Sequence, residues 1–300
     1  MKLRDRRYSP DERRPAASSF GARLPDPEAQ AQGFFFAPDE VHLKQLLVKL
    51  LKRYGRWLPL PTAALALLIW QLVSQFGGLP AFILPSPLAV AARFGKALVA
   101  GALLRHIGVT LLEVVLGLLA GSLTAMFLGY WLARSRLLER VLSPYLVASQ
   151  AIPIVAVAPL LVIWFGPGMF SKVLICALTV FFPVLVNTIV GLRAVPENLR
   201  DLMRAMHASR GQMLRHLEIP AALPVFLGGL RVGATLSVIG AVVGEFVGAD
   251  RGLGFLINVG RGQYDTALVF AALLTLIVLA MALYGAVLLL ERRLLRWHGQ

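Results

Sequence analysis

The sequence predicts an all-α integral membrane protein with about six transmembrane helices. Of its 300 residues, 57% are hydrophobic and only 15% are charged, whereas a typical soluble domain has about a quarter charged residues. The mean hydropathy is +0.71, and charged residues are scarce mainly because the chain contains long apolar runs. Each run is near or above the ~20 residues that a helix needs to cross ~30 Å of hydrocarbon.

Two segments of different composition come before the first apolar run. Residues 1–40 are rich in Arg, Asp, Pro and Ala without a sustained apolar period, which predicts a disordered cytoplasmic tail. Residues 41–57, VHLKQLLVKLLKRYGRW, repeat leucine at helical spacing, with lysine and arginine around the rest of the turn. This pattern predicts an amphipathic helix lying on an anionic leaflet. No apolar segment follows the early basic residues closely enough for a signal peptide.

Six apolar runs follow, and we interpret them as the spans of a transmembrane domain, 58–300. The third contains Pro144, Pro153 and Pro159, so we expect a kinked span whose freed carbonyls are satisfied by neighbouring helices. Glycines recur at four-residue spacing in the second and fifth runs, which allows close helix packing within one subunit or at a dimer seam. The six runs are Leu58–Phe76, Ile107–Ala133, Val141–Phe165, Val173–Leu192, Ala221–Val247 and Ala267–Leu290.

Lysine and arginine are distributed unequally between the connections. With the N-terminus inside, the inner segments hold 23 of these residues and the outer segments, counting Lys172, hold six. The asymmetry predicts that both termini lie in the cytoplasm. Although the net charge is +14, basic residues are not interleaved with aromatic ones, so no nucleic-acid binding is expected.

Few chemical motifs are present. The single cysteine, Cys176, excludes an intrachain disulfide and a cysteine-based metal cluster, and we expect it to be a small buried hydrophobe. No G-x-x-x-x-G-K-[ST] loop, nucleophile elbow, zincin motif or paired histidine motif occurs. We therefore predict no catalytic and no metal-binding residues.

The connection between the fourth and fifth spans, residues 193–220, is long for a helical bundle, where ~2–8 residues often suffice. A broken apolar stripe surrounded by arginines predicts two short helices along the membrane that meet near residues 207–211. Pro220 and Pro224 are expected to begin the next span, where a missing N–H costs little. The alternative is an ordinary solvated basic loop.

Residues 201–220 resemble the cytoplasmic signature of ATP-binding cassette importer permeases, E-A-A-x3-G-x9-I-x-L-P. The second half, LEIPAALP, matches closely, while the first half has Asp201 for the glutamate and His207 for the glycine. The resemblance implies a coupling helix that docks in a groove of an ATPase subunit. We consider Gly211 as the flexible position that replaces the missing glycine. The coupling residues expected on this basis are Asp201, Met206, His207, Ala208, Ser209, Arg210, Gly211, Leu217 and Pro220.

Further strings extend the resemblance over about residues 41–297. Residues 83–90, 147–173, 181–196 and 244–257 resemble the sulfonate, nitrate and taurine branch of these permeases. They are most similar to members that handle hydroxymethylpyrimidine, other thiamine precursors or riboflavin.

This resemblance implies a type I importer-like fold in the cell (inner or plasma) membrane and a non-catalytic permease subunit. It also implies a separate ATPase that binds ATP and Mg²⁺, no cofactor on this chain, an extracytoplasmic solute-binding protein and a second copy of the permease.

Ionisable side chains at membrane depth are costly and are therefore functional candidates. Glu113, Arg231 and Glu245 qualify. Glu113 and Glu245 are placed to share an outer vestibule, where two acidic groups would disfavour an anionic substrate unless they are protonated or paired. A structural role is the alternative for both. The alternative for Arg231 is a structural pairing with backbone carbonyls or with a carboxylate on another helix.

Polar and aromatic residues of the third and fourth spans complete the candidate translocation pathway: Gln150, Trp164, Phe182 and Asn187. An uncharged aromatic solute would stack on phenylalanine and bond to the amides, although phenylalanine more often only packs. The function that the resemblance implies is a permease for a pyrimidine, thiamine precursor or riboflavin-like solute. An anion importer of the sulfonate type is the first alternative. A stand-alone channel or secondary transporter is the second, although we find no internal repeat that would support it.

Overall fold

The computed structural model describes residues 59–295, and every regular element among them is a helix. The predicted all-α class is confirmed. The chain divides into two compact units, residues 1–64 and 65–300, and the contacts described below belong to the second. The tail predicted at 1–40 and the amphipathic helix predicted at 41–57 lie outside the described residues.

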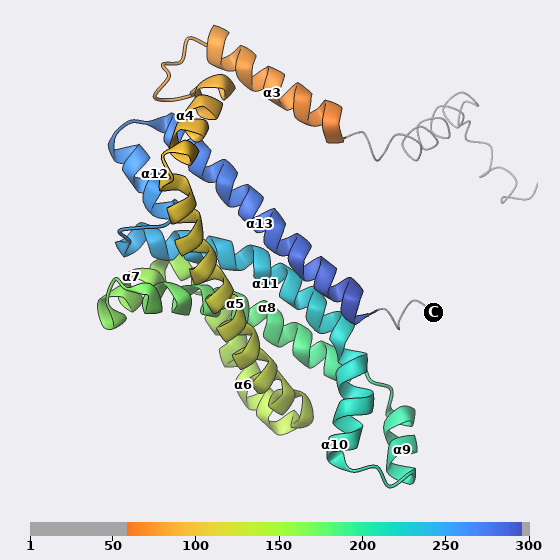
Figure 1. The fold of residues 1–300 in the computed structure, drawn as a ribbon. Helices are drawn as coiled ribbons and strands as arrows, with labels where there is room; N and C mark the ends of the chain where they lie inside the picture. Colours follow the sequence, from red (N-terminus) through yellow and green to blue (C-terminus); the bar gives the residue numbers. More distant parts are fainter. Residues whose placement is uncertain (1–58, 296–300) are drawn as a thin grey trace, which may run out of the picture. The chain divides into compact units, whose positions relative to one another are not determined.

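The helices are shown in chain order in Figure 1. They are α3 (Pro59–Phe76), α4 (Pro87–Val99), α5 (Ala102–Arg134), α6 (Arg136–Gln150), α7 (Ile154–Phe165), α8 (Met169–Arg193), α9 (Glu197–Ala205), α10 (Arg210–Met213), the π-helical turn η1 (Leu214–Glu218), α11 (Ile219–Gly248), α12 (Leu253–Gly262) and α13 (Thr266–Leu294).

Four helices are long and apolar enough to cross a membrane: α5, α8, α13 and the continuous helix Arg210–Gly248 that α10, η1 and α11 form together. The predicted third span is instead two helices, α6 and α7, with a bend of 95° between them. Counting this pair as one span gives up to five, and the apolar helix α3 is shorter. The predicted number of about six spans is therefore not confirmed.

The break between α6 and α7 follows from Pro153. This residue precedes the first turn of α7, and a proline disfavours helical geometry at the residue before it, here Ile152. Pro144 and Pro159 lie inside α6 and α7 without ending them. The structure thus has more than the kink expected from the sequence.

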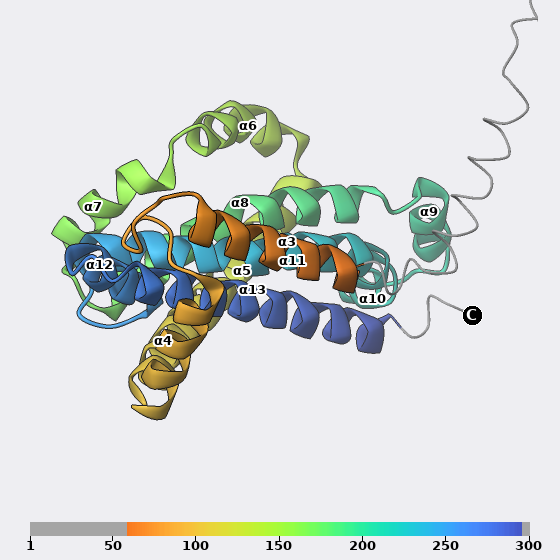
Figure 2. The same ribbon diagram turned by 90° about the horizontal axis from the view of Figure 1, so that it is seen from above.

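Helix α8 packs closely against both α5 and α11, and α11 in turn lies between α8 and α13 (Figure 2). Glycines make this close approach possible on both sides of Cys176. A Cβ added to Gly117 of α5 would lie 2.2 Å from Cys176 Cβ, and one added to Gly240 of α11 would lie 2.9 Å from Cys176 Cα. Cys176 is buried, as expected. These glycines of the four-residue pattern therefore serve packing within the subunit.

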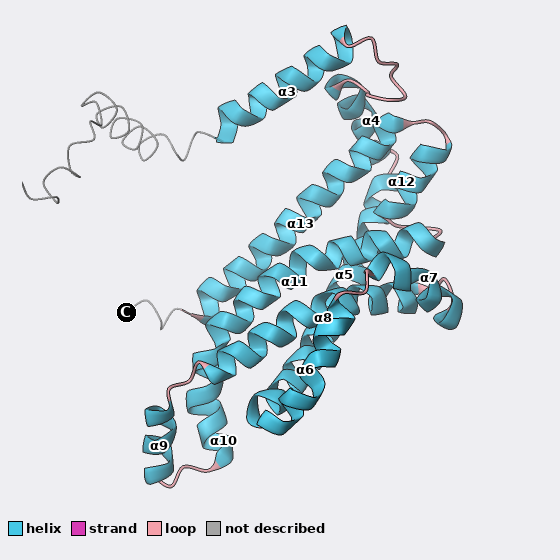
Figure 3. Ribbon diagram, turned by 180° about the vertical axis from the view of Figure 1, so that it is seen from behind, coloured by secondary structure: helices cyan, strands magenta, loops and turns pink. Residues whose placement is uncertain are grey.

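Helices α8, α11 and α13 run side by side, with α12 at one end and α9 and α10 at the other (Figure 3). We call residues 93–113, 169–172 and 240–266 the α12 end. We call residues 130–140 and 190–220 the coupling end. The candidate sites lie at these two ends and along α8.

Candidate functional site

The coupling end is a helical hairpin whose tip is residues 206–209. Helix α9 ends at Ala205, and His207 then takes the left-handed conformation, with φ of 57°. Such a φ is uncommon for a residue other than glycine. The ring Nδ1 of His207 lies 3.1 Å from the carbonyl oxygen of Ala205. His207 therefore makes the turn at the position of the family's glycine, and the expectation that Gly211 replaces it is wrong, since Gly211 lies inside α10.

The second arm of the hairpin begins with a capping box. Ser209 Oγ accepts a hydrogen bond from the Gln212 N–H at 3.3 Å, and Gln212 Oε1 accepts one from the Ser209 N–H at 2.8 Å. From Arg210 the helix continues to Gly248. The prediction of a second separate short helix, with the span beginning at Pro220, is therefore wrong. A π-helical turn directly before Pro220 lets the helix pass a residue that has no N–H to donate.

The predicted coupling residues are largely exposed. Met206 is 70% exposed, and apolar Leu199 and Leu202 of α9 are exposed beside it. Exposed apolar residues rimmed by polar ones are typical of a surface that a partner covers. Asp201, His207, Ser209, Arg210 and Gly211 are also exposed, while Ala208, Leu217 and Pro220 are half-buried.

The α12 end holds a buried polar cluster. Glu113 of α5 and Glu245 of α11 are each 1% exposed, and the two side chains interact with one another. Lys172 of α8 is buried with them, its Nζ 3.7 Å from Glu113 Oε1. The structure therefore brings Glu113 and Glu245 together, as the sequence predicted, but buries both in the bundle instead of along a vestibule. Lys172, which was expected in an outer connection, belongs to the core.

The same cluster caps the first turn of α12. The N–H of Gly252 donates to His106 Nδ1 at 2.9 Å, and the N–H of Leu253 donates to Thr110 Oγ at 2.8 Å. Glu245 accepts from the N–H of Gly254 at 2.5 Å and from the Thr110 hydroxyl at 2.6 Å. Side chains from α5 and α11 thus satisfy three N–H groups that a helix start leaves without partners.

Only glycine fits at the start of this cap. Gly252 has a φ of 115°, and a Cβ there would lie 2.2 Å from the carboxyl carbon of Glu245. Sequence reasoning missed His106, Thr110 and Lys172. The one available signal was the glycine pair in GADRGLG, Gly252 and Gly254, which marks a close backbone approach.

Arg231 forms an ion pair with Glu291 of α13 and lies over the Tyr284 ring, with the guanidinium carbon 5.6 Å from the ring centre. The structure thus shows the alternative considered for this residue, a carboxylate partner on another helix.

A cavity of about 450 Å³ lies between α8 and the bend that joins α6 to α7. Gln150, Thr179 and Phe182 line it, and the Phe181 and Phe182 rings meet edge to face at 5.1 Å. A second cavity of about 550 Å³ continues along α6 and α8 and shares Gln150 with the first. Gln150 and Phe182 therefore line the same cavity.

Two other predicted pathway residues lie elsewhere. Trp164 is exposed on α7 and does not line this cavity. Asn187 donates to the carbonyl oxygen of Pro183 at 2.8 Å, and its side chain lies where a Cβ on Gly229 would sit. Asn187 therefore fills the crossing of α8 and α11. In residues 59–295 no group of three or more His, Cys, Asp or Glu side chains is placed to hold a metal ion.

An all-helical bundle with several apolar spans is the architecture of a multi-pass membrane protein. The fold is similar to a chain of the MetNI methionine ABC transporter in an inward-facing conformation, with a TM-score of 0.56 and 21% identity over 65% of this chain and 97% of that chain. Residues 115–296 match the family of binding-protein-dependent transport system inner membrane components, and the chain belongs to this family.

Relatives with assigned substrates fall on several branches. The riboflavin transport system permease of Chloroflexus aurantiacus is 49% identical over 84% of this chain and 95% of its own length. The formylaminopyrimidine transport permease of Halalkalibacterium halodurans is 36% identical over 77% and 92%. The taurine transport system permease of Escherichia coli is 30% identical over 81% and 90%.

The protein is therefore a multi-pass inner membrane component and the non-catalytic permease subunit of an ABC importer. Its family implies ATPase and binding-protein partners in general.

Proposed function

We propose that this chain forms the translocation pathway for a small uncharged aromatic solute, a flavin or a pyrimidine, that a binding protein delivers. A separate ATPase binds ATP and Mg²⁺ and docks on the α9–α10 hairpin, which faces the cytoplasm. Two copies of the chain enclose the pathway. ATP-driven movement of the hairpin then switches the bundle between inward-open and outward-open states.

The observation that carries the substrate class is the 49% identity with a riboflavin permease over 84% of the chain. The cavity beside α8 supports it. Its lining offers an amide at Gln150, a hydroxyl at Thr179 and a ring at Phe182, and none of the described residues that line it is charged. An aromatic ring system can stack and hydrogen-bond there. The cation that lines the adjoining cavity, Arg193, is paired with Glu139, so a sulfonate would have to compete with that carboxylate.

Uptake by the reconstituted importer tests the substrate class. The permease, its ATPase and its binding protein are placed in proteoliposomes, and ATP-driven uptake of riboflavin, formylaminopyrimidine and taurine is compared. We expect uptake of riboflavin or the pyrimidine and none of taurine. Uptake of taurine alone would favour the sulfonate-type anion importer. Accumulation by the permease without the ATPase would favour a stand-alone transporter.

Matched variants test the pathway residues. Gln150→Ala and Phe182→Ala should each lower uptake about tenfold, the effect of losing one positioned contact of about 1.4 kcal/mol. The controls are Gln263→Ala, exposed at the end of α12, and Phe170→Ala, exposed on α8, and both should transport normally. Equal losses of uptake in the controls would show that Gln150 and Phe182 have no specific role in the pathway.

The docking surface is tested by association with the ATPase. His207→Asp, at the hairpin tip, should weaken the complex while the purified permease stays folded. A complex that remains as tight as with the unchanged permease would contradict the assignment.

A further inference from the structure

A basic pocket lies at the coupling end and shares Ala208 and Arg210 with the residues predicted to dock the ATPase. Its volume is about 690 Å³, and residues of α5, α8, α9, α10 and η1 line it. The charged residues among them are Arg134, Arg200, Arg204, Arg210, Glu197 and Glu218. Four arginines against two glutamates leave a net charge of +2, so the pocket attracts an anion.

Two of these arginines are not matched by carboxylates. Arg134 pairs with Glu218 at 2.8 Å, and Arg204 pairs with Asp201 at 2.9 Å. In contrast, the Nη2 N–H of Arg200 donates to the Leu192 carbonyl oxygen at 2.7 Å. The Nε of Arg200 is buried and has no hydrogen-bond partner among the described residues. Within residues 59–295 Arg210 has no ion pair either. Guanidinium donors of this kind fit a phosphate group.

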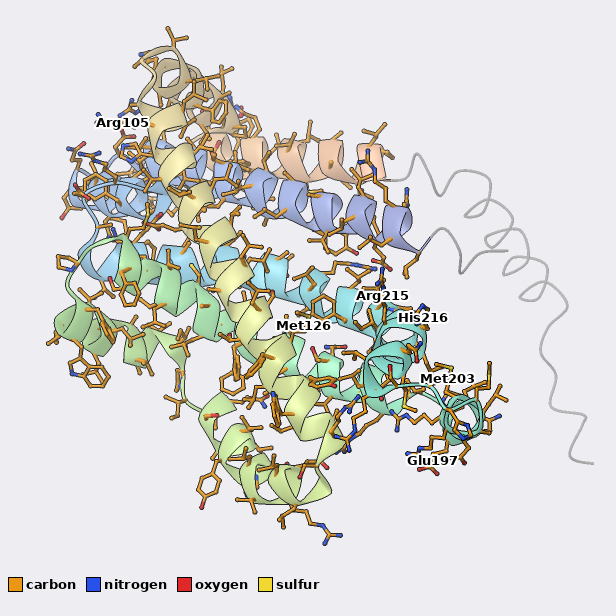
Figure 4. All side chains as sticks on the ribbon, turned by 60° about the horizontal axis from the view of Figure 1, so that its bottom comes forward. Arg105, Met126, Glu197, Met203, Arg215 and His216 are labelled. Carbon is orange, nitrogen blue, oxygen red and sulfur yellow. The ribbon has the colours of Figure 1, made fainter. Side chains whose placement is uncertain are left out.

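An apolar groove continues directly from the pocket. Its volume is about 460 Å³, and Tyr130 and Leu192 line both the groove and the pocket. Leu123, Met126 and Phe127 of α5 form its wall, and all three are exposed, Phe127 by 69%. Figure 4 labels Met126, which lines the groove, and Glu197, which lines the pocket. Basic and apolar surfaces therefore meet at two shared residues.

The length of the groove matches one leaflet. Leu123 and Arg134 lie eleven residues apart on α5, which is ~16 Å at 1.5 Å per residue. Half of the ~30 Å hydrocarbon core is about the same distance. An acyl chain in the groove would thus end near the middle of the bilayer, with its headgroup at Arg134.

We propose that this surface binds an anionic phospholipid of the leaflet on the coupling side, with its phosphate at Arg200 and Arg210 and an acyl chain along Leu123, Met126 and Phe127. Basic pockets between helices at the interface bind anionic headgroups by the same chemistry. The lipid joins the hairpin to α5, because the pocket draws on both. This site is separate from the proposed substrate cavity beside α8.

Lipid binding is measured on the whole chain without its ATPase, by native mass spectrometry in mild detergent. Dioleoyl phosphatidylglycerol is compared with dioleoyl phosphatidylcholine, which has the same acyl chains and no net charge, and with glycerol 3-phosphate, which has no acyl chain. We expect phosphatidylglycerol to bind at least tenfold more tightly than either. Equal affinity for the two lipids would overturn the proposal, and equally tight binding of glycerol 3-phosphate would show a free-anion pocket instead.

Charge-matched variants locate the site. Arg200→Gln with Arg210→Gln should lower the affinity for phosphatidylglycerol about tenfold or more, since each basic residue near an anionic surface contributes about fivefold. Arg292→Gln with Arg293→Gln removes the same charge from exposed positions at the end of α13 and should change nothing. An equal loss in this control would overturn the site. If the first pair fails to fold, the exposed Arg210→Gln alone should give about a fivefold loss, and no loss would count against the pocket.

A second copy of the chain is the competing occupant of the groove. Met126→Cys, made with Cys176→Ser, should not form a disulfide between two copies if lipid fills the groove. Efficient crosslinking between copies, with loss of phosphatidylglycerol binding, would overturn the proposal.

Discussion

The two ends of the bundle are held together by different interactions. At the α12 end, Glu113, Lys172 and Glu245 are almost completely buried, and three backbone N–H groups of α12 bond to side chains from other helices. At the coupling end, the ion pairs Arg193–Glu139 and Arg204–Asp201 join partly or largely exposed side chains, and in the pair Arg134–Glu218 only the glutamate is buried.

The energies of these interactions differ accordingly. Breaking a buried charged network by removing one member costs about 3–5 kcal/mol, whereas an exposed ion pair is worth about 0–1 kcal/mol. The α12 end is therefore fixed in one arrangement. We expect the hairpin at the coupling end to shift at lower cost, as the proposed docking of an ATPase there requires. The following predictions test this contrast, from the largest expected effect to the smallest.

Glu245→Ala should give the largest loss, about 3–5 kcal/mol in the free energy of unfolding measured in mild detergent. The change leaves the Gly254 N–H and the Thr110 hydroxyl without their buried acceptor. The control Asp250→Ala removes a largely exposed carboxylate of the neighbouring loop and should stay within ~0.5 kcal/mol. A loss below ~1 kcal/mol for Glu245→Ala would contradict a fixed α12 end.

A glycine substitution at each end should have opposite signs. Gly254→Ala should destabilise by about 1–3 kcal/mol, because the new Cβ would lie 2.8 Å from Glu245 Oε2 and 3.1 Å from the Val242 carbonyl oxygen. Gly211→Ala, in α10, meets nothing within 4 Å and should stabilise by about 0.5–1 kcal/mol. Thermal unfolding of the two variants checks the prediction. If both substitutions changed the stability in the same direction, the two ends would not differ in packing as described.

His207→Gly should stabilise the hairpin by about 1 kcal/mol, since glycine adopts a positive φ without the steric cost that histidine carries. The matched control is His216→Gly in the helical arm, which should lose about 1 kcal/mol because glycine is a poor helix former. Protection of hairpin amides from hydrogen exchange reports both effects. A loss of protection in His207→Gly would mean that the His207 side chain itself holds the turn.

Arg204→Gln should have the smallest effect, below ~0.5 kcal/mol, because both partners of its ion pair are about two-thirds exposed. High salt should remove even this difference. Arg93→Gln at the α12 end should cost about 1 kcal/mol, since Arg93 bonds Asp265 at 2.7 Å and Asp265 caps α13. If thermal unfolding showed a larger loss of stability for Arg204→Gln than for Arg93→Gln, the two ends would not differ as described.

Much of the architecture was available from the sequence. Long apolar runs predicted the helices α5, α8, α11 and α13, because a helix in hydrocarbon must satisfy its backbone internally and is therefore apolar over its length. The LEIPAALP string located the coupling hairpin through a family resemblance. The same reasoning failed at local breaks, namely the 95° bend at Pro153 and the uninterrupted helix through Pro220, because proline is compatible with both outcomes.

The partners of polar residues were decided by the tertiary structure. Thr110 and Leu253 are 143 positions apart, and Thr110 and Glu245 are 135 apart, so no local pattern links them. Periodicity gives little help in a span that is apolar on every side, since it does not show which face meets another helix. The sequence by itself determined a membrane bundle and its family, because hydrophobic length and local motifs are written along the chain. Only the packing of α5, α8 and α11 decided that Glu113, Lys172 and Glu245 form one buried cluster, because such contacts depend on how helices cross.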